Sequence, residues 1–459
     1  MGVPAPKPGF LGMLPLYAKK GIIGMDLEMT EKYGRVSGIF HGRIPALLIS
    51  DAEMIKQIFV EDFSKFVNRN RFVPSVNMMK KAVSNVENEE WKYMRSIITP
   101  TFSSAKMREM CSSINLCCDR LVKKLASKID PDKAIKLDEL CQSYTMDVIA
   151  ATSFGLDIDS HNNPDNSFFK NAKRTLNFSF SLNIIVLCMM FPFLTDILDY
   201  LNIGHIPKDS AEYFINVVNQ ALDDRKADSS TRRDFLQLMM NAQKENSENS
   251  GRGLTKDEVL ANSLFFIMAG FDTTSLTIAF TLHCIAIHPE VQERAFREIQ
   301  SKLGERKPNY DNVKELEYLD MIISETLRLY PPATRLNRRA NCDTTVKGLF
   351  IPKSMVIMIP LYTLHRDPEY WIDPEDFNPE RFSPENKHTI NPYAYMPFGA
   401  GPRNCVGIRL ANLVTKIAIV TLLQNFQFIQ TPETEVKPKL ATGGFVRPQN
   451  GTWLQVRSR

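Results

Sequence analysis

The segment with the most specific chemistry is residues 398–407, here called the cysteine loop, with the sequence F-G-A-G-P-R-N-C-V-G. Gly399 and Gly401 lack a Cβ atom, so a tight turn at these positions can approach a flat cofactor closely. Cys405 follows at the predicted start of a helix, where the dipole and free N–H groups favour a thiolate over a thiol. Arg403 can pair with an anionic group of the cofactor. The segment predicts either a thiolate facing a flat cofactor or a buried cysteine in a glycine-rich turn.

A second candidate for chemistry lies at residues 269–274, with the sequence A-G-F-D-T-T. Glycine and two adjacent threonines are poor residues for the interior of a helix. One interpretation is a local bend, in which the threonine hydroxyls bond carbonyl groups one turn earlier. The residues alone favour this interpretation over a catalytic role for the segment.

Two further motifs have helical spacing. Glu325 and Arg328 are three residues apart on one predicted helix face. Such a pair in solvent contributes only about 0.2–0.5 kcal/mol. Trp91 and Arg95 are four residues apart and share one face of another predicted helix. The ordinary interpretation is a surface ion pair in the first case, and a core tryptophan beside a solvated arginine in the second.

The 269–274 segment lies in the longest helical pattern of the chain. Residues 255–258, T-K-D-E, have the spacing of a capping box, which predicts a helix beginning there. The pattern continues to Ile287, and His288-Pro289 ends it. At 1.5 Å per residue this helix would span roughly 50 Å. Because apolar residues occupy most of its sides, we expect it to cross the middle of the protein.

The remaining pattern is mostly helical. Residues 35–50 predict two strands joined by a turn at 41–43, and Asp51 predicts a helix N-cap. Helical periodicity dominates residues 87–340, with a polar loop at 243–253. Further predictions are a helix over 314–330, short strands over 344–359, an irregular proline-rich stretch over 367–402, and a last helix from near Cys405 to about Leu423. Since no linker divides the chain, we expect a mainly α fold with a small β portion in one unit.

Composition argues against several classes of function. The 459 residues are 44% hydrophobic and 24% charged, with a net charge of +4 and no basic run typical of nucleic-acid binding. The eight cysteines form no C-x-x-C pair, which disfavours a zinc site and indicates a reducing compartment. The seven histidines include no H-E-x-x-H motif. The proline-rich N-terminus has neither a signal peptide nor an apolar run long enough to span a bilayer.

The cysteine loop does not fit a nucleotide. Asn404 occupies the third glycine position of the dinucleotide motif G-x-G-x-x-G, and the chain has no Walker A motif. We therefore expect that the chain does not bind NADPH itself and that a partner protein supplies electrons.

The pattern F-x-x-G-x-R-x-C-x-G resembles the haem-binding signature of the cytochrome P-450 superfamily, and residues 269–274 resemble its oxygen-activation motif. Nearly the whole chain is similar to vertebrate family 3, subfamily A, the drug- and steroid-oxidising group. The resemblance implies a mainly α cytochrome P-450 fold with a long central helix across haem b. It implies one catalytic domain at residues 1–459, without the usual N-terminal membrane anchor. Cys405 would be the thiolate ligand of the haem iron, which pushes electron density onto iron and favours O–O cleavage.

The same resemblance implies roles for individual residues. Thr273 would hydrogen-bond the dioxygen that is activated, and Asp272 would help relay protons, a general-acid role suited to a carboxylate in a partly solvated opening of the helix. Glu325 and Arg328 would join Arg381 in a buried structural network. The residues implied to hold the haem, besides Cys405, are Phe398, Gly399, Arg403, Arg69, Trp91, Arg95 and Arg338. Those implied to line an apolar substrate pocket are Phe72, Phe265, Met268, Ala269, Ala333, Thr334 and Leu336.

The implied activity is insertion of one oxygen atom from O2 into lipophilic substrates such as steroids, drugs and other xenobiotics. Electrons would come from NADPH through NADPH-cytochrome reductase, with cytochrome b5 as a further donor, at the cytoplasmic face of the endoplasmic reticulum membrane. The apolar stretch 178–194 would touch the membrane, or else form a buried core helix. Two other functions stay open: a haem-thiolate isomerase or synthase, and a haem or lipophile carrier without catalysis. Retention of Asp272 and Thr273 favours the monooxygenase.

Overall fold

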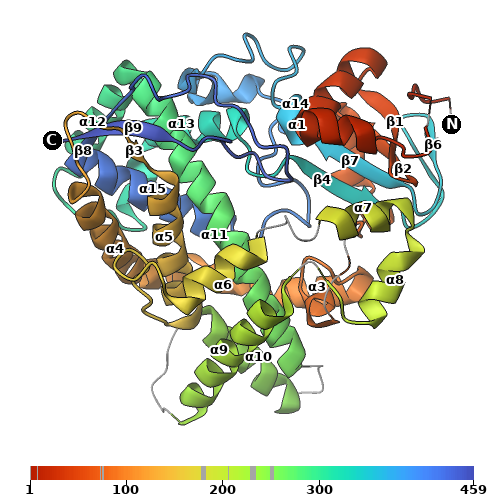
Figure 1. Ribbon diagram of the computed structural model, residues 1–459, viewed down its shortest axis with the longest axis horizontal. Coiled ribbons are helices and arrows are strands. Elements are labelled where there is room, and N and C mark those ends of the chain that lie inside the picture. Colours follow the sequence, from red (N-terminus) through yellow and green to blue (C-terminus); the bar gives the residue numbers. More distant parts are fainter. Residues whose placement is uncertain are drawn as a thin grey trace.

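Figure 1 shows the computed structural model, which describes residues 2–7, 9–72, 74, 77–176, 182–204, 206–227, 234–248 and 253–459. The helices are α1 (Leu14–Tyr33), α2 (Ala52–Lys56), α3 (Asn88–Ile98), α4 (Ser104–Ala126), α5 (Asp138–Ile149), α6 (Ser167–Leu176), α7 (Leu182–Met190), α8 (Phe193–Tyr200), α9 (Lys208–Ala227), α10 (Phe235–Glu248), α11 (Lys256–Ile287), α12 (Pro289–Lys302), α13 (Glu317–Leu329), α14 (Leu361–Leu364) and α15 (Ile408–Asn425). The strands are β1 (Val36–His41), β2 (Ile44–Ile49), β3 (Ile135–Lys136), β4 (Arg335–Arg339), β5 (Thr344–Val346), β6 (Leu349–Ile351), β7 (Val356–Pro360), β8 (Phe426–Ile429) and β9 (Trp453–Ser458). The predicted mainly α fold with a small β portion is confirmed.

Helix α11 runs obliquely through the middle of the molecule (Figure 1). The predicted capping box fixes its start: Thr255 Oγ1 accepts a hydrogen bond from the Glu258 N–H at 3.3 Å, and Glu258 Oε2 accepts one from the Thr255 N–H at 2.7 Å. The helix ends at Ile287, as predicted. Among the described residues, α11 is the one helix long and apolar enough to cross a membrane, yet 72% of its apolar stretch is buried inside the protein. Such burial is typical of a core helix.

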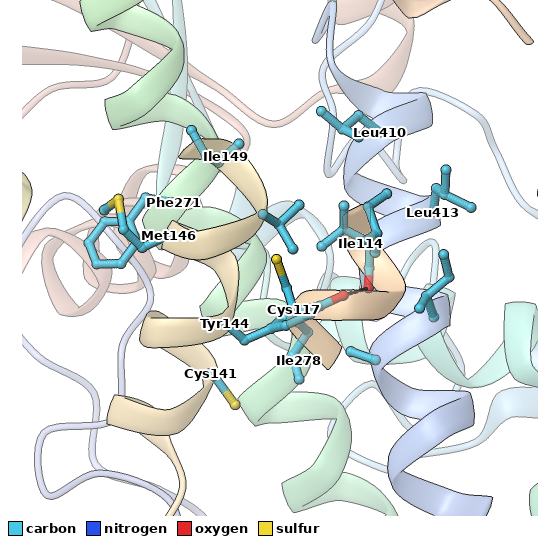
Figure 2. Close-up of a cluster of buried hydrophobic side chains, with 14 of the residues drawn as sticks. Ile114, Cys117, Cys141, Tyr144, Met146, Ile149, Phe271, Ile278, Leu410 and Leu413 are labelled. Atoms are coloured by element: carbon cyan, nitrogen blue, oxygen red, sulfur yellow. Dashed lines mark hydrogen bonds between the residues drawn. The ribbon is translucent and has the colours of Figure 1, made fainter. Parts of the chain in front are cut away.

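Helices α4, α5 and α15 pack around α11 and form the main hydrophobic core (Figure 2). The fully buried hydroxyl of Tyr144 in α5 donates to the Val414 carbonyl of α15 at 3.1 Å, which satisfies its polar group. Gly270 of α11 faces Ile149 of α5, and a Cβ atom at residue 270 would lie 2.4 Å from Ile149 Cδ1. The glycine of the 269–274 segment therefore permits close contact between two helices.

The larger sheet has the strand order β1-β2-β7-β4. Strands β1 and β2 form the predicted hairpin, β2 pairs with β7 in parallel, and β7 pairs with β4 in antiparallel orientation. Asp51 is the predicted N-cap of α2, and its Oδ1 accepts a hydrogen bond from the Met54 N–H at 2.8 Å. Strand β4 lies at the edge of this sheet and carries two predicted site residues, Leu336 and Arg338.

Two predicted boundaries are wrong. Helix α15 begins at Ile408, after a turn at residues 406–407, so Cys405 precedes the helix. The Cys405 N–H donates to the Phe398 carbonyl across the cysteine loop. Helix α10 continues to Glu248, inside the predicted loop at 243–253, because its Gln, Lys and Glu residues are good helix formers. Residues 249–252 of that predicted loop lie outside the described residues, as do 178–181 of the apolar stretch 178–194.

Candidate functional site

The cysteine loop is a tight hairpin that presents Cys405 to the interior of the protein. The Cys405 N–H donates to the Phe398 carbonyl at 2.8 Å. Gly399 and Gly401 have φ angles of +74° and +68°, in the left-handed region that glycine favours. A Cβ atom at residue 401 would lie 1.9 Å from the carbonyl oxygen of Phe59. The loop therefore requires glycine at residue 401 for its backbone conformation and also for space.

Cys405 lies deep in the protein, yet its side chain is exposed, because it faces an internal cavity of about 710 Å³. Burial raises the pKa of its thiol, while the Gly407 N–H and the charges of Arg69 and Arg95 act in the opposite direction. Cys405 lies three residues before α15, and the free N–H group that acts on its thiol belongs to Gly407, the N-cap of that helix. A thiolate at Cys405 thus depends on a cation at the sulfur, and a metal ion deprotonates a coordinating thiol.

Four guanidinium groups lie near the cysteine loop and form no ion pair with a carboxylate in the described part of the chain: Arg69, Arg95, Arg338 and Arg403. Arg69 Nη2 donates to the Arg403 carbonyl at 3.1 Å. Arg95 donates to the carbonyl and side-chain oxygens of Asn404 at 2.9 and 2.7 Å. Arg338 and Arg403 likewise donate only to backbone carbonyl groups. Positive charge therefore accumulates beside Cys405, and no described carboxylate forms an ion pair with any of the four groups.

The protonated, charged form of these four arginines is destabilised by their surroundings. Burial lowers the pKa of all four groups, and for Arg69, Arg338 and Arg403 the neighbouring arginines lower it further, to about 9 in the case of Arg403. The Nε atoms of Arg338 and Arg403 are buried and have no hydrogen-bond partner among the described residues. A bound anion would reverse the pKa shifts and satisfy these donors. The site therefore fits a flat cofactor with acidic substituents, as the two propionates of haem b provide.

The structure brings the other predicted haem-binding residues to different parts of this site. Phe398, Trp91, Arg69, Arg95 and Arg403 line the cavity. The Arg403 guanidinium lies over the ring of the buried Trp91, 4.9 Å from its centroid. Gly399 and Arg338 do not line the cavity: Gly399 shapes the cysteine loop, and Arg338 acts on Arg69 and Arg403 through its charge.

Helix α11 supplies one wall of the cavity. Of its two predicted catalytic residues, Thr273 faces the cavity and Asp272 does not. Thr273 lines the cavity, and its hydroxyl donates to the Ala269 carbonyl at 2.8 Å. Asp272 does not line the cavity; it is 1% exposed and forms an ion pair with Arg447. Burial raises the pKa of Asp272, although Arg447 opposes this shift. The expected partly solvated position of Asp272 is therefore wrong, and no sequence signal indicated Arg447 as its partner, 175 residues away.

The predicted substrate-pocket residues mostly share the cavity. Those that line it are Phe72, Phe265, Met268, Ala269, Ala333 and Leu336. Thr334 is the exception, because it is buried outside the cavity and its hydroxyl donates to the Gly444 carbonyl at 2.9 Å. Phe445, from the same C-terminal segment, lines the cavity although the sequence did not indicate it.

Glu325 and Arg328 of helix α13 form a network with Arg381. The first two are fully buried and form a bidentate ion pair, with Nε–Oε2 and Nη2–Oε1 distances of 2.7 Å each. Arg381 Nε donates to Glu325 Oε1 at 3.3 Å. Arg328 also donates to three backbone carbonyl groups in the segment 365–376. The network ties α13 to the irregular segment that precedes the cysteine loop.

Comparison with known proteins agrees with this geometry. The family model described as Cytochrome P-450 matches residues 2–456. The chain belongs to the cytochrome P-450 family. Cytochrome P-450 3A6 of Oryctolagus cuniculus is 45% identical over 463 residues, which cover all of this chain and 92% of that protein. With the same coverage, cytochrome P-450 3A13 of Mus musculus is 43% identical and cytochrome P-450 3A9 of Rattus norvegicus is 42% identical.

As a cytochrome P-450, the chain is a haem-thiolate monooxygenase, and its cofactor is haem b. Cys405 belongs to the sequence motif and lines the cavity. A chain of this family receives its electrons from a reductase, in line with the lack of a nucleotide-binding loop in the sequence.

Proposed function

We propose that this cytochrome P-450 oxidises lipophilic steroids, drugs and other xenobiotics in the cavity that Cys405 and Thr273 share. The observation that carries the proposal is that these two residues line one cavity, whose other walls include the apolar side chains of Phe72, Phe265 and Leu336. Haem b, held by the Cys405 thiolate, would supply activation of dioxygen when bound. The apolar walls would exclude water and hold a lipophilic substrate. Residues 1–459 would act as a single catalytic domain.

We assign the binding of the haem propionates to Arg69, Arg95 and Arg403, which line the cavity, and to Arg338, which lies behind them with a buried Nε that has no hydrogen-bond partner among the described residues. The support is that these guanidinium groups have no carboxylate partner in the described residues and that burial lowers their pKa values. Arginine binds carboxylates through two parallel N–H···O bonds, which suits this task. Trp91 would fix the position of Arg403 through its ring.

Thr273 would guide protons to the reacting dioxygen. Its hydroxyl proton is engaged with the Ala269 carbonyl, so the oxygen can accept a hydrogen bond from water in the cavity. A water held at Oγ1 would be placed to deliver a proton. Asp272 would join the relay only after its carboxylate exchanges Arg447 for solvent, and the Arg447 side chain is 39% exposed, which makes that exchange possible.

Replacing Thr273 by alanine is expected to leave haem binding intact and to divert reducing equivalents to hydrogen peroxide. We expect product formed per NADPH to fall at least about tenfold, since positioned proton transfer contributes roughly 10²–10⁴-fold. The measurement is NADPH consumption against product and peroxide. Thr281→Ala is a matched control, because Thr281 makes the same bond one turn back, to the Thr277 carbonyl at 2.7 Å, but does not line the cavity. Unchanged coupling in Thr273→Ala would disprove the proposed role.

Electrons would reach this chain from NADPH through NADPH-cytochrome reductase, with cytochrome b5 as a further donor, at the cytoplasmic face of the endoplasmic reticulum. A membrane-facing surface is supported by α7 and α8, whose exposed apolar side chains include Leu187 (45%), Phe193 (60%) and Ile197 (47%). Exposed apolar surface of this kind suits the boundary of a lipid bilayer. The alternative of a fully buried core helix over 178–194 does not agree with these exposures.

Electron dependence tests the proposal against its alternatives. The haem-loaded chain is mixed with reductase, NADPH and a lipophilic substrate such as testosterone, and oxygenated product is measured. A monooxygenase forms product only with both reductase and NADPH. If product forms from an organic peroxide without any electron donor, and no oxygenated product forms with reductase and NADPH, the chain is an isomerase or synthase. Binding without any product would indicate a carrier.

A further inference from the structure

One cavity-lining arginine does not face the cysteine loop. Arg69 and Arg95 donate to residues of that loop, and Arg403 belongs to it. Arg71 instead reaches helix α8, where its Nη1 atom donates to Asp199 Oδ2 at 3.3 Å. This guanidinium is therefore a charge on the cavity wall that the proposed haem site does not use.

Asp199 is shared between two cations. Lys80 Nζ lies 3.2 Å from the same Oδ2 atom that Arg71 contacts, and the Asp199 side chain is only 5% exposed. Charge-assisted N–H···O bonds are typically about 2.7–2.9 Å long, so both contacts are longer than the optimum. Two cations thus contact one carboxylate, each at a distance longer than the optimum. Positive charge is therefore available for a further anion.

Arg71 also has unused donors. Its Nε and Nη2 groups make no hydrogen bond with the described residues, and a third of its side chain (33%) is exposed. A guanidinium presents its N–H groups in a planar fork that matches a carboxylate or a sulfate. The next residue, Phe72, lines the same cavity and packs edge-on against His41, with ring centroids 4.8 Å apart. The cavity therefore offers this guanidinium together with an apolar side chain that packs against a neighbour.

We infer that Arg71 forms an anion subsite in the substrate cavity, which selects lipophilic organic anions carrying a carboxylate or sulfate over their uncharged analogues. The inference rests on the proposed monooxygenase function. The anionic end of the substrate would pair with Arg71, and its hydrocarbon part would lie along the apolar walls of the cavity. The charge would thereby fix which carbon atoms of the substrate can approach the reacting centre.

Dodecanoic acid and methyl dodecanoate test the subsite, since they differ in the carboxylate charge. Equilibrium dialysis of the haem-loaded protein gives both dissociation constants without turnover. The wild-type protein is expected to bind the acid more tightly than the ester. Arg71→Ala is expected to weaken binding of the acid about tenfold, through loss of a charge-assisted hydrogen bond. Binding of the ester should stay within about twofold, as for a change at a partly exposed side chain.

Asp199→Asn is the opposite test, because it removes the competing carboxylate and keeps the shape of the side chain. This variant is expected to bind the acid more tightly than the wild type does. Equal affinities of the wild type for acid and ester, or an unchanged affinity for the acid in Arg71→Ala, would overturn the inference. The carbon monoxide spectrum of the same preparations separates the two hypotheses. A normal thiolate band without preference for the acid rejects the subsite alone, whereas a missing band contradicts the proposed function.

Discussion

Replacing Arg328 by alanine is expected to lower the free energy of unfolding by about 3–5 kcal/mol, because the buried carboxylate of Glu325 would keep only the Asn378 N–H at 2.9 Å and the longer contact with Arg381. Glu325 is fully buried, and after the substitution only Arg381 Nε, at 3.3 Å, would face it with a positive charge. The three carbonyl groups that Arg328 satisfies would also lose their donor. A domain is stable by only about 5–15 kcal/mol. We therefore expect little soluble, haem-loaded protein, measured as Soret absorbance per mole of chain.

Arg297→Ala provides a matched control for Arg328→Ala. Arg297 and Glu293 also form a helical ion pair, at 3.1 Å, but their side chains are 77% and 44% exposed. Exposed pairs of this kind contribute about 0–1 kcal/mol, so the control should fold and bind haem normally. If Arg328→Ala gave the same haem content and the same denaturation midpoint as Arg297→Ala, the network would not have the structural role assigned to it.

Replacing Gly401 by alanine is expected to destroy the cysteine loop. Its φ angle of +68° costs a residue with a Cβ roughly 1–2 kcal/mol. The new Cβ atom would also lie 1.9 Å from the Phe59 carbonyl oxygen, so two backbone segments must move apart. Overpacking of this kind adds about 1–3 kcal/mol. Because the displaced segment carries Cys405, we expect the haem-to-protein ratio to fall strongly.

Gly399→Ala separates the two costs of the Gly401 substitution. Gly399 has a similar φ angle, +74°, but the nearest atom to an added Cβ is Leu336 Cδ1 at 3.6 Å, an ordinary contact. Gly399→Ala strains the backbone through its positive φ angle but creates no steric clash, so this variant should retain more haem than Gly401→Ala. Equal haem contents in the two variants would show that space beside Phe59 does not limit the loop.

Helix ends that are fixed by residues close in sequence were predicted correctly. The capping box at Thr255 and the His288-Pro289 stop define α11 within the chain itself, and both ends are where they were predicted. Asp51 caps α2 for the same reason. Helix α15 begins three residues after its predicted start near Cys405, because residues 406–407 form a turn that the sequence did not indicate.

Contacts between distant segments escaped prediction. Asp272 meets Arg447 and Thr334 meets Gly444, and neither sequence separation leaves a periodic signal. The acid of the 269–274 segment therefore points away from the cavity, although its neighbour Thr273 lines it. Helical geometry explains this difference, because successive residues on a helix face directions about 100° apart. A motif thus indicates which residues act together, while packing decides which of them face the cavity.

The most direct test of the account is the absorption spectrum of the dithionite-reduced protein with and without carbon monoxide. A thiolate ligand at Cys405 predicts a strongly red-shifted Soret band in the carbon monoxide complex, and Cys405→Ser should lose that band while the protein remains folded. A band at the position typical of histidine-ligated or thiol-ligated haem in the wild type would contradict thiolate ligation. Persistence of the red-shifted band in Cys405→Ser would show that another residue is the ligand.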